Sequence, residues 1–264
     1  MEAEQLKEVI RSYNKPKKIA VCTAWGSPFT WTVPAYNMAN LIRPEGVDVL
    51  YLPGHGWCPA RRHMYGVERA LEWGASHICF LGPDQVHPFD ILLKFTKHLM
   101  DGWSAVAARV PIRGWGKLQE KPFTKMAWKW RFPDDPKRRT FTLNDLTEVD
   151  PKDGDLQEIA VVGSGALIFD VACLKMMKKP WFYERMRKND QEMYEAYDRL
   201  PIMDTTFCYR LATEGTARIL CDLTIDVKHI DAFAIDETYG DRFPDWPKDD
   251  KHTVLFRGEL PGTI

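Results

Sequence analysis

Four short apolar runs alternate with helix-like stretches in the first part of the chain, and this alternation limits the possible folds more than any other feature. The predicted strands are residues 18–24, 47–52, 76–81 and 104–110. The helices predicted between them are residues 33–41, 63–73 and 88–100. Strands that are joined by crossover helices pair in parallel. The pattern therefore predicts an α/β fold with a mostly parallel, Rossmann-like central sheet flanked by helices, and ligands at the carboxyl ends of its strands.

The second part of the chain is interrupted by a segment that is rich in Lys, Arg, Trp and Pro. We expect this insertion to hold at most a small hairpin or sub-domain. After it, regular structure is predicted as a strand over 158–170, a helix to 179, a helix over 204–215, and strands over 217–221 and 224–229. The 264 residues are enough for one large domain with a full core. Its predicted parts are 18–110, the insertion 111–157, a second half 158–230 and a tail 231–264.

Composition excludes several classes of protein. The net charge of −1 gives no global field for nucleic acid or an anionic membrane, so such a role needs a local patch. The charged opening residues lack the apolar stretch of a signal peptide, and no run reaches the roughly 18 apolar residues of a spanning helix. The six cysteines are scattered without CxxC spacing. We therefore expect a soluble, cytoplasmic protein without structural zinc or disulfides.

The loop after the third predicted strand, Gly82-Pro83-Asp84-Gln85, carries an acid where a parallel sheet binds its ligands. A carboxylate at this place can hold a divalent cation that neutralises a diphosphate. The alternative is that Asp84 caps the helix that follows. The residues alone leave both interpretations open.

Three more positions combine candidate chemistry with an ordinary structural role. Gly163-Ser164-Gly165 interrupts a β-branched run, which marks either close approach of a ligand or a β-bulge. Asp204 begins a predicted helix and His229 ends a predicted strand. Capping and a structural histidine are the corresponding alternatives.

Three segments of the chain resemble, in the right order, GT-A-fold nucleotide-sugar glycosyltransferases of the family-2-like kind. Residues 60–93 resemble the family's Arg-initiated helix and the strand that ends in Asp-x-Asp. Residues 161–182 (VVGSGALIFDVACLKMMKKPWF) resemble the acceptor-side strand with Gly-x-Gly and a Pro-Trp-Phe. Residues 203–230 resemble the Glu-Asp helix and a final strand that ends in a metal-facing His. The resemblance implies a hexosyltransferase-type enzyme that uses a UDP- or GDP-sugar.

The resemblance also assigns roles to positions of this chain. Asp84 matches the second acid of Asp-x-Asp, which bridges metal and diphosphate, whereas Gly82 stands where the first acid belongs. His229 matches the carboxyl-terminal metal ligand, and Mn²⁺ or Mg²⁺ is the implied cofactor. Asp204 matches the base that takes the acceptor hydroxyl's proton in inverting members. The positions that match donor-binding residues are Thr23, Ala24, Arg62, Asp84, Gln85, Gly163, Ser164 and Gly165.

Two other functions remain as alternatives. A sugar-1-phosphate nucleotidyltransferase shares this kind of sheet, but that class carries an early Gly-rich loop with an Arg and a Lys. The corresponding loop here is Trp25-Gly26-Ser27-Pro28. The acid missing at Gly82 also fits a non-catalytic module that binds a sugar nucleotide or nucleic acid.

The insertion is the predicted acceptor-binding segment. Nine Lys or Arg residues lie between Arg113 and Arg139, with five aromatic residues among them and three acids. Cations with aromatic residues suit nucleic acid, through phosphate contacts and base stacking. They also suit a sugar, a phosphorylated acceptor, an anionic lipid surface or a solvated flap. DNA with a modified base is one candidate acceptor, and the residues predicted to bind it are Lys125, Lys129, Trp130 and Arg131.

Overall fold

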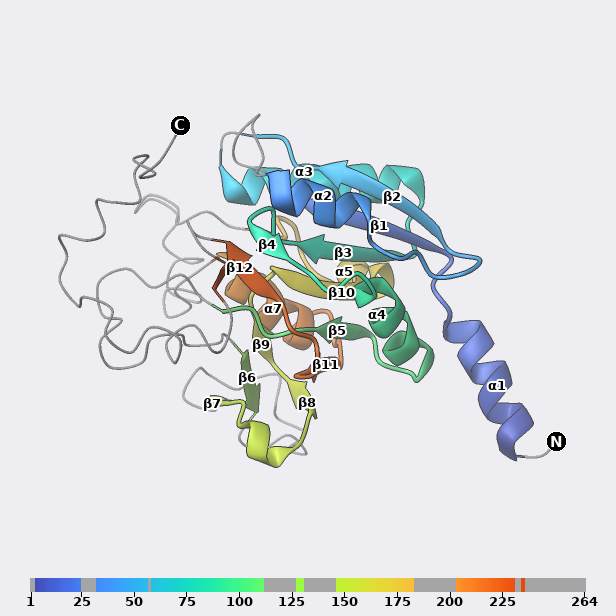
Figure 1. The fold of residues 1–264 in the computed structure, drawn as a ribbon. Helices are drawn as coiled ribbons and strands as arrows, with labels where there is room; N and C mark the ends of the chain where they lie inside the picture. Colours follow the sequence, from blue (N-terminus) through green and yellow to red (C-terminus); the bar gives the residue numbers. More distant parts are fainter. Residues whose placement is uncertain are drawn as a thin grey trace, which may run out of the picture.

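A seven-stranded sheet forms the centre of the molecule in the computed structural model (Figure 1). The structure describes residues 3–24, 32–56, 58–111, 127–130, 146–182, 203–230 and 234–235. The strand order is β2-β1-β3-β10-β5-β11-β8. The strands are β1 (Lys18–Thr23), β2 (Asp48–Pro53), β3 (His77–Leu81), β5 (Ala105–Ala107), β8 (Leu156–Ile159), β10 (Ala166–Asp170) and β11 (Ile219–Asp222).

The predicted α/β fold with a mostly parallel sheet is confirmed. β1 pairs in parallel with both β2 and β3, and β11 pairs in parallel with β5. β10 runs antiparallel between β3 and β5, and β8 runs antiparallel at the edge beside β11. Five of the seven strands therefore run in one direction. Because β10 runs the other way, the turn that precedes it lies at the same edge as the carboxyl end of β3.

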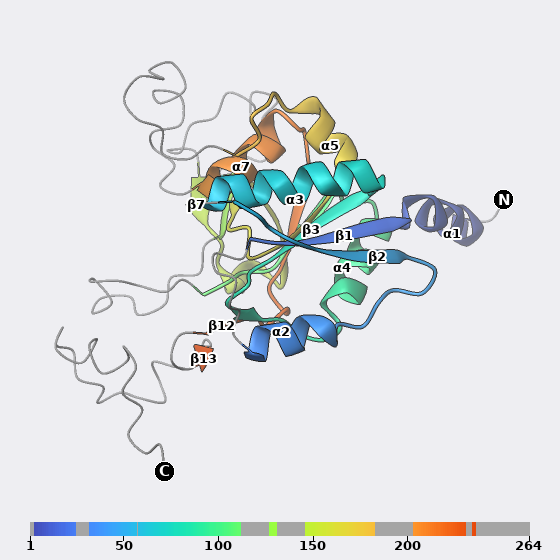
Figure 2. The same cartoon turned by 90° about the horizontal axis from the view of Figure 1, so that it is seen from above.

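Helices cover both faces of the sheet (Figure 2). One face carries α2 (Thr32–Ala39) and α4 (Ile91–Met100), and the other carries α3 (Pro59–Trp73), α5 (Val171–Met176) and α7 (Met203–Thr213). Strand residues alternate between the two resulting cores: Ile19 and Val21 pack in the cluster of α2 and α4, whereas Ala20 and Cys22 pack on the opposite face. This alternation is the period of two that a β-strand imposes.

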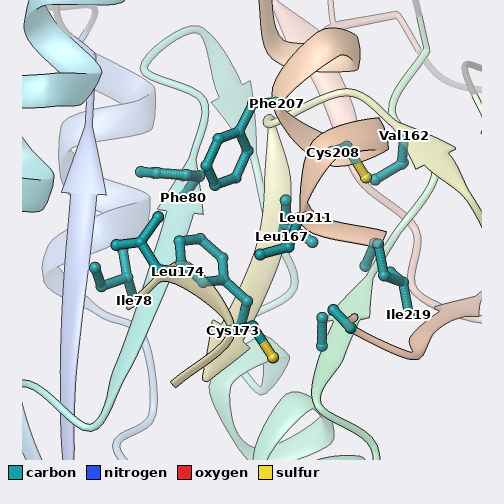
Figure 3. Packing of buried hydrophobic residues seen from close by; sticks show 14 of the residues in the cluster. Ile78, Phe80, Val162, Leu167, Cys173, Leu174, Phe207, Cys208, Leu211 and Ile219 are labelled. Atoms are coloured by element: carbon teal, nitrogen blue, oxygen red, sulfur yellow. The ribbon is translucent and has the colours of Figure 1, made fainter. Parts of the chain in front are cut away.

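Aromatic packing fixes α7 against the sheet (Figure 3). The rings of Phe80 on β3 and Phe207 on α7 are fully buried, with their centroids 5.7 Å apart. Phe169 on β10 contacts both rings. Burying a side chain of this size contributes roughly 1.5–3 kcal/mol. The first turn of α7, which carries Asp204, is therefore held in a fixed position beside the ends of β3 and β10.

Two small sheets flank the central one. The first joins β4 (Gln85–Val86), β12 (Lys228–Ile230) and β13 (Ala234–Ile235), and the second joins β6 (Ala127–Trp130), β7 (Leu146–Glu148) and β9 (Val161–Val162). Strands β6 and β7 pair in antiparallel fashion within the insertion, where a small hairpin was expected. Residues 112–126 and 131–145 of the insertion lie outside the described residues. The remaining elements are the helix α1 (Ala3–Asn14) and a short 3₁₀ helix at Pro151–Asp153.

Several predicted boundaries are wrong. The single strand expected over residues 158–170 is three strands, β8, β9 and β10, because β9 leaves the central sheet to pair with β6. The helix expected from Pro88 starts at Ile91, after a turn in which the Ile91 N–H bonds to the Pro88 carbonyl. The helix expected to reach Lys179 ends at Met176. Helix α1 was not predicted. In the described part of the chain, no helix has the length and apolar character needed to cross a bilayer.

Candidate functional site

The carboxyl ends of β1 and β2 meet the start of α3 at a tight corner. Gly54 donates its N–H to the carbonyl of Thr23, with the two atoms 2.5 Å apart. A Cβ at Gly54 would lie 2.8 Å from that carbonyl and 2.9 Å from the Cβ of Arg62, so only glycine fits. The Arg62 guanidinium is held by the Gly56 carbonyl at 2.9 Å. The Thr23 carbonyl and the Cβ of Arg62 thus both lie beside Gly54, and Ala24 follows Thr23 directly. Their assignment to the donor site stays a prediction.

Asp84 and His229 lie side by side because β4 pairs with β12. Gln85 stands opposite His229 in that ladder, and the Ile230 N–H bonds to the Asp84 carbonyl. The Nε2 atom of His229 lies 3.4 Å from Oδ1 of Asp84. Asp84 does not cap a helix, since the N-cap position of α4 is Asp90. Short strands of this kind give little sequence signal, so the pairing was not predicted.

The tautomer of His229 follows from its second contact. Nδ1 lies 2.6 Å from the carbonyl of Pro111, which accepts a hydrogen bond and so places the proton on Nδ1. When the imidazole is neutral, Nε2 is an acceptor that faces a carboxylate oxygen, which is also an acceptor. Such a pair needs a second proton or a cation between its atoms. Donation of the other ring N–H to a backbone carbonyl is also how metal-binding histidines are oriented.

Asp84 and His229 fit a divalent cation by chemistry, because carboxylate oxygen and imidazole nitrogen are both ligands of Mn²⁺. Within the described ranges, no group of three or more His, Cys, Asp or Glu side chains gathers in the manner of a complete metal centre. A cation held by this pair would take its other ligands from water or from phosphate oxygens. The predicted metal site remains a prediction.

The Gly163–Gly165 turn and Asp204 form the other side of the candidate site. The segment is a turn between β9 and β10, so the bulge within one strand that sequence allowed is wrong. The Ser164 N–H donates to Oδ2 of Asp204 at 3.1 Å, and the Thr205 N–H donates to Oδ1 at 2.9 Å. Asp204 lies inside the first turn of α7 rather than ahead of it, so it is not the cap that we expected. Burial raises the pKa of its carboxyl, and the hydrogen bonds from Ser164 and Thr205 lower it in part.

Two histidines that were not singled out from the sequence lie beside this turn. His87 donates from Nε2 to the Gly165 carbonyl at 3.0 Å, and the amide of Asn37 bonds both the N–H and the carbonyl of His87. His63 on α3 stacks on Phe182, with 4.9 Å between ring centroids, and its Nε2 lies 3.5 Å from Oγ of Ser164. His87 follows β4 directly, and no strand or helix periodicity marks it in the sequence.

We expect the protein to lose stability as the pH falls from about 6.5 to about 4. Burial lowers the pKa of both His63 and His87 to about 4, with the Arg62 charge adding to the shift of His63 and the His229 charge to that of His87. A folded-state pKa below the unfolded value means that the unfolded chain binds the proton first. Near pH 4, each histidine then lowers the free energy of unfolding by up to about 3 kcal/mol. Asp204 acts in the opposite sense, because its raised pKa favours protonation in the folded state.

Urea unfolding at a series of pH values measures this effect. His63→Phe keeps a ring in the aromatic cluster and should remove about half of the histidine contribution to the pH slope. His55→Phe makes the same change at an exposed histidine and serves as the control for the substitution itself. A wild-type free energy of unfolding that does not change between pH 7 and pH 4.5 would contradict the prediction.

Of the predicted acceptor residues, the structure describes the Lys129 side chain and the backbone of Trp130. The Lys129 ammonium bonds to the carboxylate of Asp153 and to Oε1 of Gln157. Lys125 and Arg131 lie outside the described residues. The acceptor assignment therefore stays a prediction, and in this conformation Lys129 is engaged by partners within the protein.

Comparisons with known proteins show similarity in fold. No family model matches the chain, and no curated protein matches its sequence. The crystal structure of A197 from STIV matches with a TM-score of 0.50 at 14% identity, over 83% of this chain and 90% of that one. Two further similar structures have lower scores. The 4-diphosphocytidyl-2C-methyl-D-erythritol synthase from Anaerococcus prevotii matches at 0.36 with 15% identity over 73% of this chain and 86% of its own. The nucleoside-diphosphate-sugar pyrophosphorylase from Vibrio cholerae matches at 0.31 with 12% identity over 78% of this chain and 91% of its own.

The similarity to A197, which extends over most of both chains, agrees with the α/β fold and mostly parallel central sheet described above. At 14% identity, the match to A197 concerns the fold, and a function for this chain must be argued from its own residues.

Proposed function

We propose that the chain is a transferase that acts on a sugar nucleotide bound along the edge formed by the carboxyl ends of β1 and β3 and the start of β10. The nucleoside would lie at the Thr23–Arg62 corner, and the diphosphate would face Asp84 and His229. The sugar would then lie toward the Gly163–Gly165 turn and Asp204. Ligands of open α/β sheets bind at this edge, outside the carboxyl ends of the parallel strands.

The close approach of Nε2 of His229 to the Asp84 carboxylate is the observation that carries this proposal. The two atoms lie 3.4 Å apart, and the Pro111 carbonyl holds the proton of His229 on the far nitrogen. A second proton on His229 would make this contact an ion pair. A divalent cation bound between the two side chains would also supply what a diphosphate leaving group needs, namely neutralisation of its charge. The sequence resemblance points to the same two residues.

Glycosyl transfer is the reaction that the residues favour. It requires a base within reach of an acceptor hydroxyl, and Asp204 provides a carboxylate whose pKa is raised by burial. The Ser164 and Thr205 N–H groups hold that carboxylate in one orientation. The acceptor oxygen would attack the anomeric carbon, its proton would pass to Asp204, and the nucleoside diphosphate would leave.

Nucleotidyl transfer is the second candidate, and the synthase from Anaerococcus prevotii and the pyrophosphorylase from Vibrio cholerae are named for activities nearer to it than to glycosyl transfer. In that reaction a sugar phosphate attacks the α-phosphorus of a nucleoside triphosphate and pyrophosphate leaves. The two reactions are distinguished by their products. Asp204 as a base is needed in the first reaction and has no assigned part in the second.

Phosphorus NMR of the purified protein with UDP-sugars, with GDP-sugars, and with nucleoside triphosphates plus sugar phosphates tests the proposal. Glycosyl transfer, or slow hydrolysis in its place, releases nucleoside diphosphate. Nucleotidyl transfer releases pyrophosphate. Neither product, together with no binding of any sugar nucleotide in calorimetry, would overturn the proposal.

If DNA is the acceptor, we expect binding that weakens steeply with salt. Each phosphate contact contributes about −0.9 to the slope of log K against log[salt], so replacing Lys125 and Arg131 by Ala should reduce the slope by about 2. Lys129→Ala is the matched control, because Lys129 is already paired with Asp153. That change should alter the slope little and cost up to about 1 kcal/mol of stability. Undetectable binding at low ionic strength would remove DNA as the acceptor.

A further inference from the structure

Gln85, the residue after Asp84, packs into the space beside two glycines. It is 5% exposed. A Cβ built on Gly82 would lie 2.3 Å from Cδ of Gln85, and one built on Gly165 would lie 2.3 Å from its Nε2. Real Cβ contacts do not fall below about 3.0 Å. At both glycines the three nearest atoms all belong to the Gln85 amide.

The Gln85 amide is the nearest obstacle to a larger residue at position 82. Neither Gly82 nor Gly165 has a positive φ, so both conformations are open to any L-residue. An acid at position 82 would need the volume that the amide fills. Gly82 stands where the Asp-x-Asp pattern of the similar family has its first acid. Because Gly82 has no side chain, the Gln85 amide can fill the volume beside it.

The pairing of β4 with β12 fixes the backbone of Gln85. Its backbone pairs with His229 in the β4–β12 ladder, and the Gly82 N–H bonds to the Gly165 carbonyl at 2.8 Å. That carbonyl also accepts from His87, two residues further on. Among the described residues, Oε1 of Gln85 has no hydrogen-bond partner. The ladder therefore fixes the backbone of Gln85, and its amide fills the space beside the two glycines without a hydrogen bond to Oε1.

We infer that the Gln85 amide occupies the place of an acid at position 82, and that this leaves the Asp84–His229 pair with a low affinity of its own for a divalent cation. This inference rests on the proposed function, in which that pair faces the diphosphate. Mg²⁺ and Mn²⁺ bind through carboxylates and phosphate oxygens. Asp84 is the sole carboxylate in the loop 82–87. The protein would then hold the cation mainly together with a nucleotide, whose phosphates supply the missing charge.

Stability measurements test the steric part without any ligand. We expect Gly82→Ala to lower the urea midpoint clearly in the wild-type background and to have little effect in a Gln85→Ala background. Gly66→Ala is the control, because Gly66 approaches Cys22 and not Gln85, so its effect should add to that of Gln85→Ala. Equal effects of Gly82→Ala in the two backgrounds would overturn the inference.

Calorimetric titration with Mn²⁺ alone tests the affinity part. The Gly82→Asp/Gln85→Ala double variant should bind Mn²⁺ about tenfold more tightly than Gln85→Ala, since it gains a carboxylate with room to reach the cation. Gly82→Asp alone should be destabilised and should show no such gain. The inference would be overturned if the double variant and Gln85→Ala bound Mn²⁺ with equal affinity. It would also be overturned if Gly82→Asp alone were stable and bound Mn²⁺ as tightly as the double variant. The proposed function is tested separately, by measuring the binding of sugar nucleotides to the wild type.

Discussion

Replacing Asp204 by Asn is expected to slow sugar transfer by about 10²- to 10⁴-fold while the protein stays folded. The amide cannot accept the proton of the acceptor hydroxyl. Its oxygen still accepts one of the two backbone N–H groups that Ser164 and Thr205 donate. One hydrogen bond is lost, but the cost of burying a charge is removed as well. The melting temperature should therefore stay near that of the wild type.

Asp170→Asn is the matched control for this variant. Asp170 is a true helix cap, whose side chain accepts from the Ala172 N–H at the start of α5. Asn caps about as well as Asp, so neither stability nor rate should change much. Single-turnover rates with both variants make the measurement. If Asp204→Asn turned over at a near-normal rate, the role of Asp204 would be structural.

Asp84→Ala is expected to abolish the gain in nucleotide affinity that Mn²⁺ provides. The wild type should bind a nucleoside diphosphate at least about tenfold more tightly with the cation than with a chelator, which corresponds to 1.4 kcal/mol. Without the carboxylate, His229 alone faces the cation, and the two conditions should give similar affinities. Far-UV circular dichroism should remain unchanged, because the backbone pairing of β4 with β12 does not need the Asp84 side chain.

Asp226→Ala is the control for Asp84→Ala. Asp226 is exposed and pairs loosely with Lys228 at 3.9 Å, so its removal takes one negative charge from the same region without touching the pair. This variant should keep the full effect of Mn²⁺. If Asp84→Ala also kept it, the cation would not bind at Asp84 and the assignment of this pair would be wrong.

Sequence reasoning located the elements of the first half within a few residues, because each strand and helix there carries its own local pattern. Gly74 is an example, because it was predicted to end the helix α3 and it does. Its φ of 77° is the left-handed conformation that commonly ends a helix. The second half was less predictable. Whether β9 continues into β10 or leaves to join β6 depends on pairing with residues far along the chain, and no local pattern encodes that choice.

Sequence reasoning named residues for the candidate site and one of the contacts among them, and their functional roles stay predictions. Asp84 and His229 were expected together, and they are. The contact between Asp204 and Ser164 was not expected, since each had been assigned its own local role. The orientation of Gln85 depends on a two-residue strand that pairs across the sequence. The Gln85 side chain was predicted to bind the nucleotide-sugar donor, and in the structure it packs against Gly82 and Gly165.

A crystal structure with UDP or GDP and Mn²⁺ tests the central claim most directly. The account predicts the base beside Thr23, and the diphosphate and cation between Asp84 and His229. It also predicts an open space toward Asp204 and the Gly163–Gly165 turn for the sugar. A nucleotide bound elsewhere, or no nucleotide at this edge of the sheet at saturating concentration, would contradict the claim.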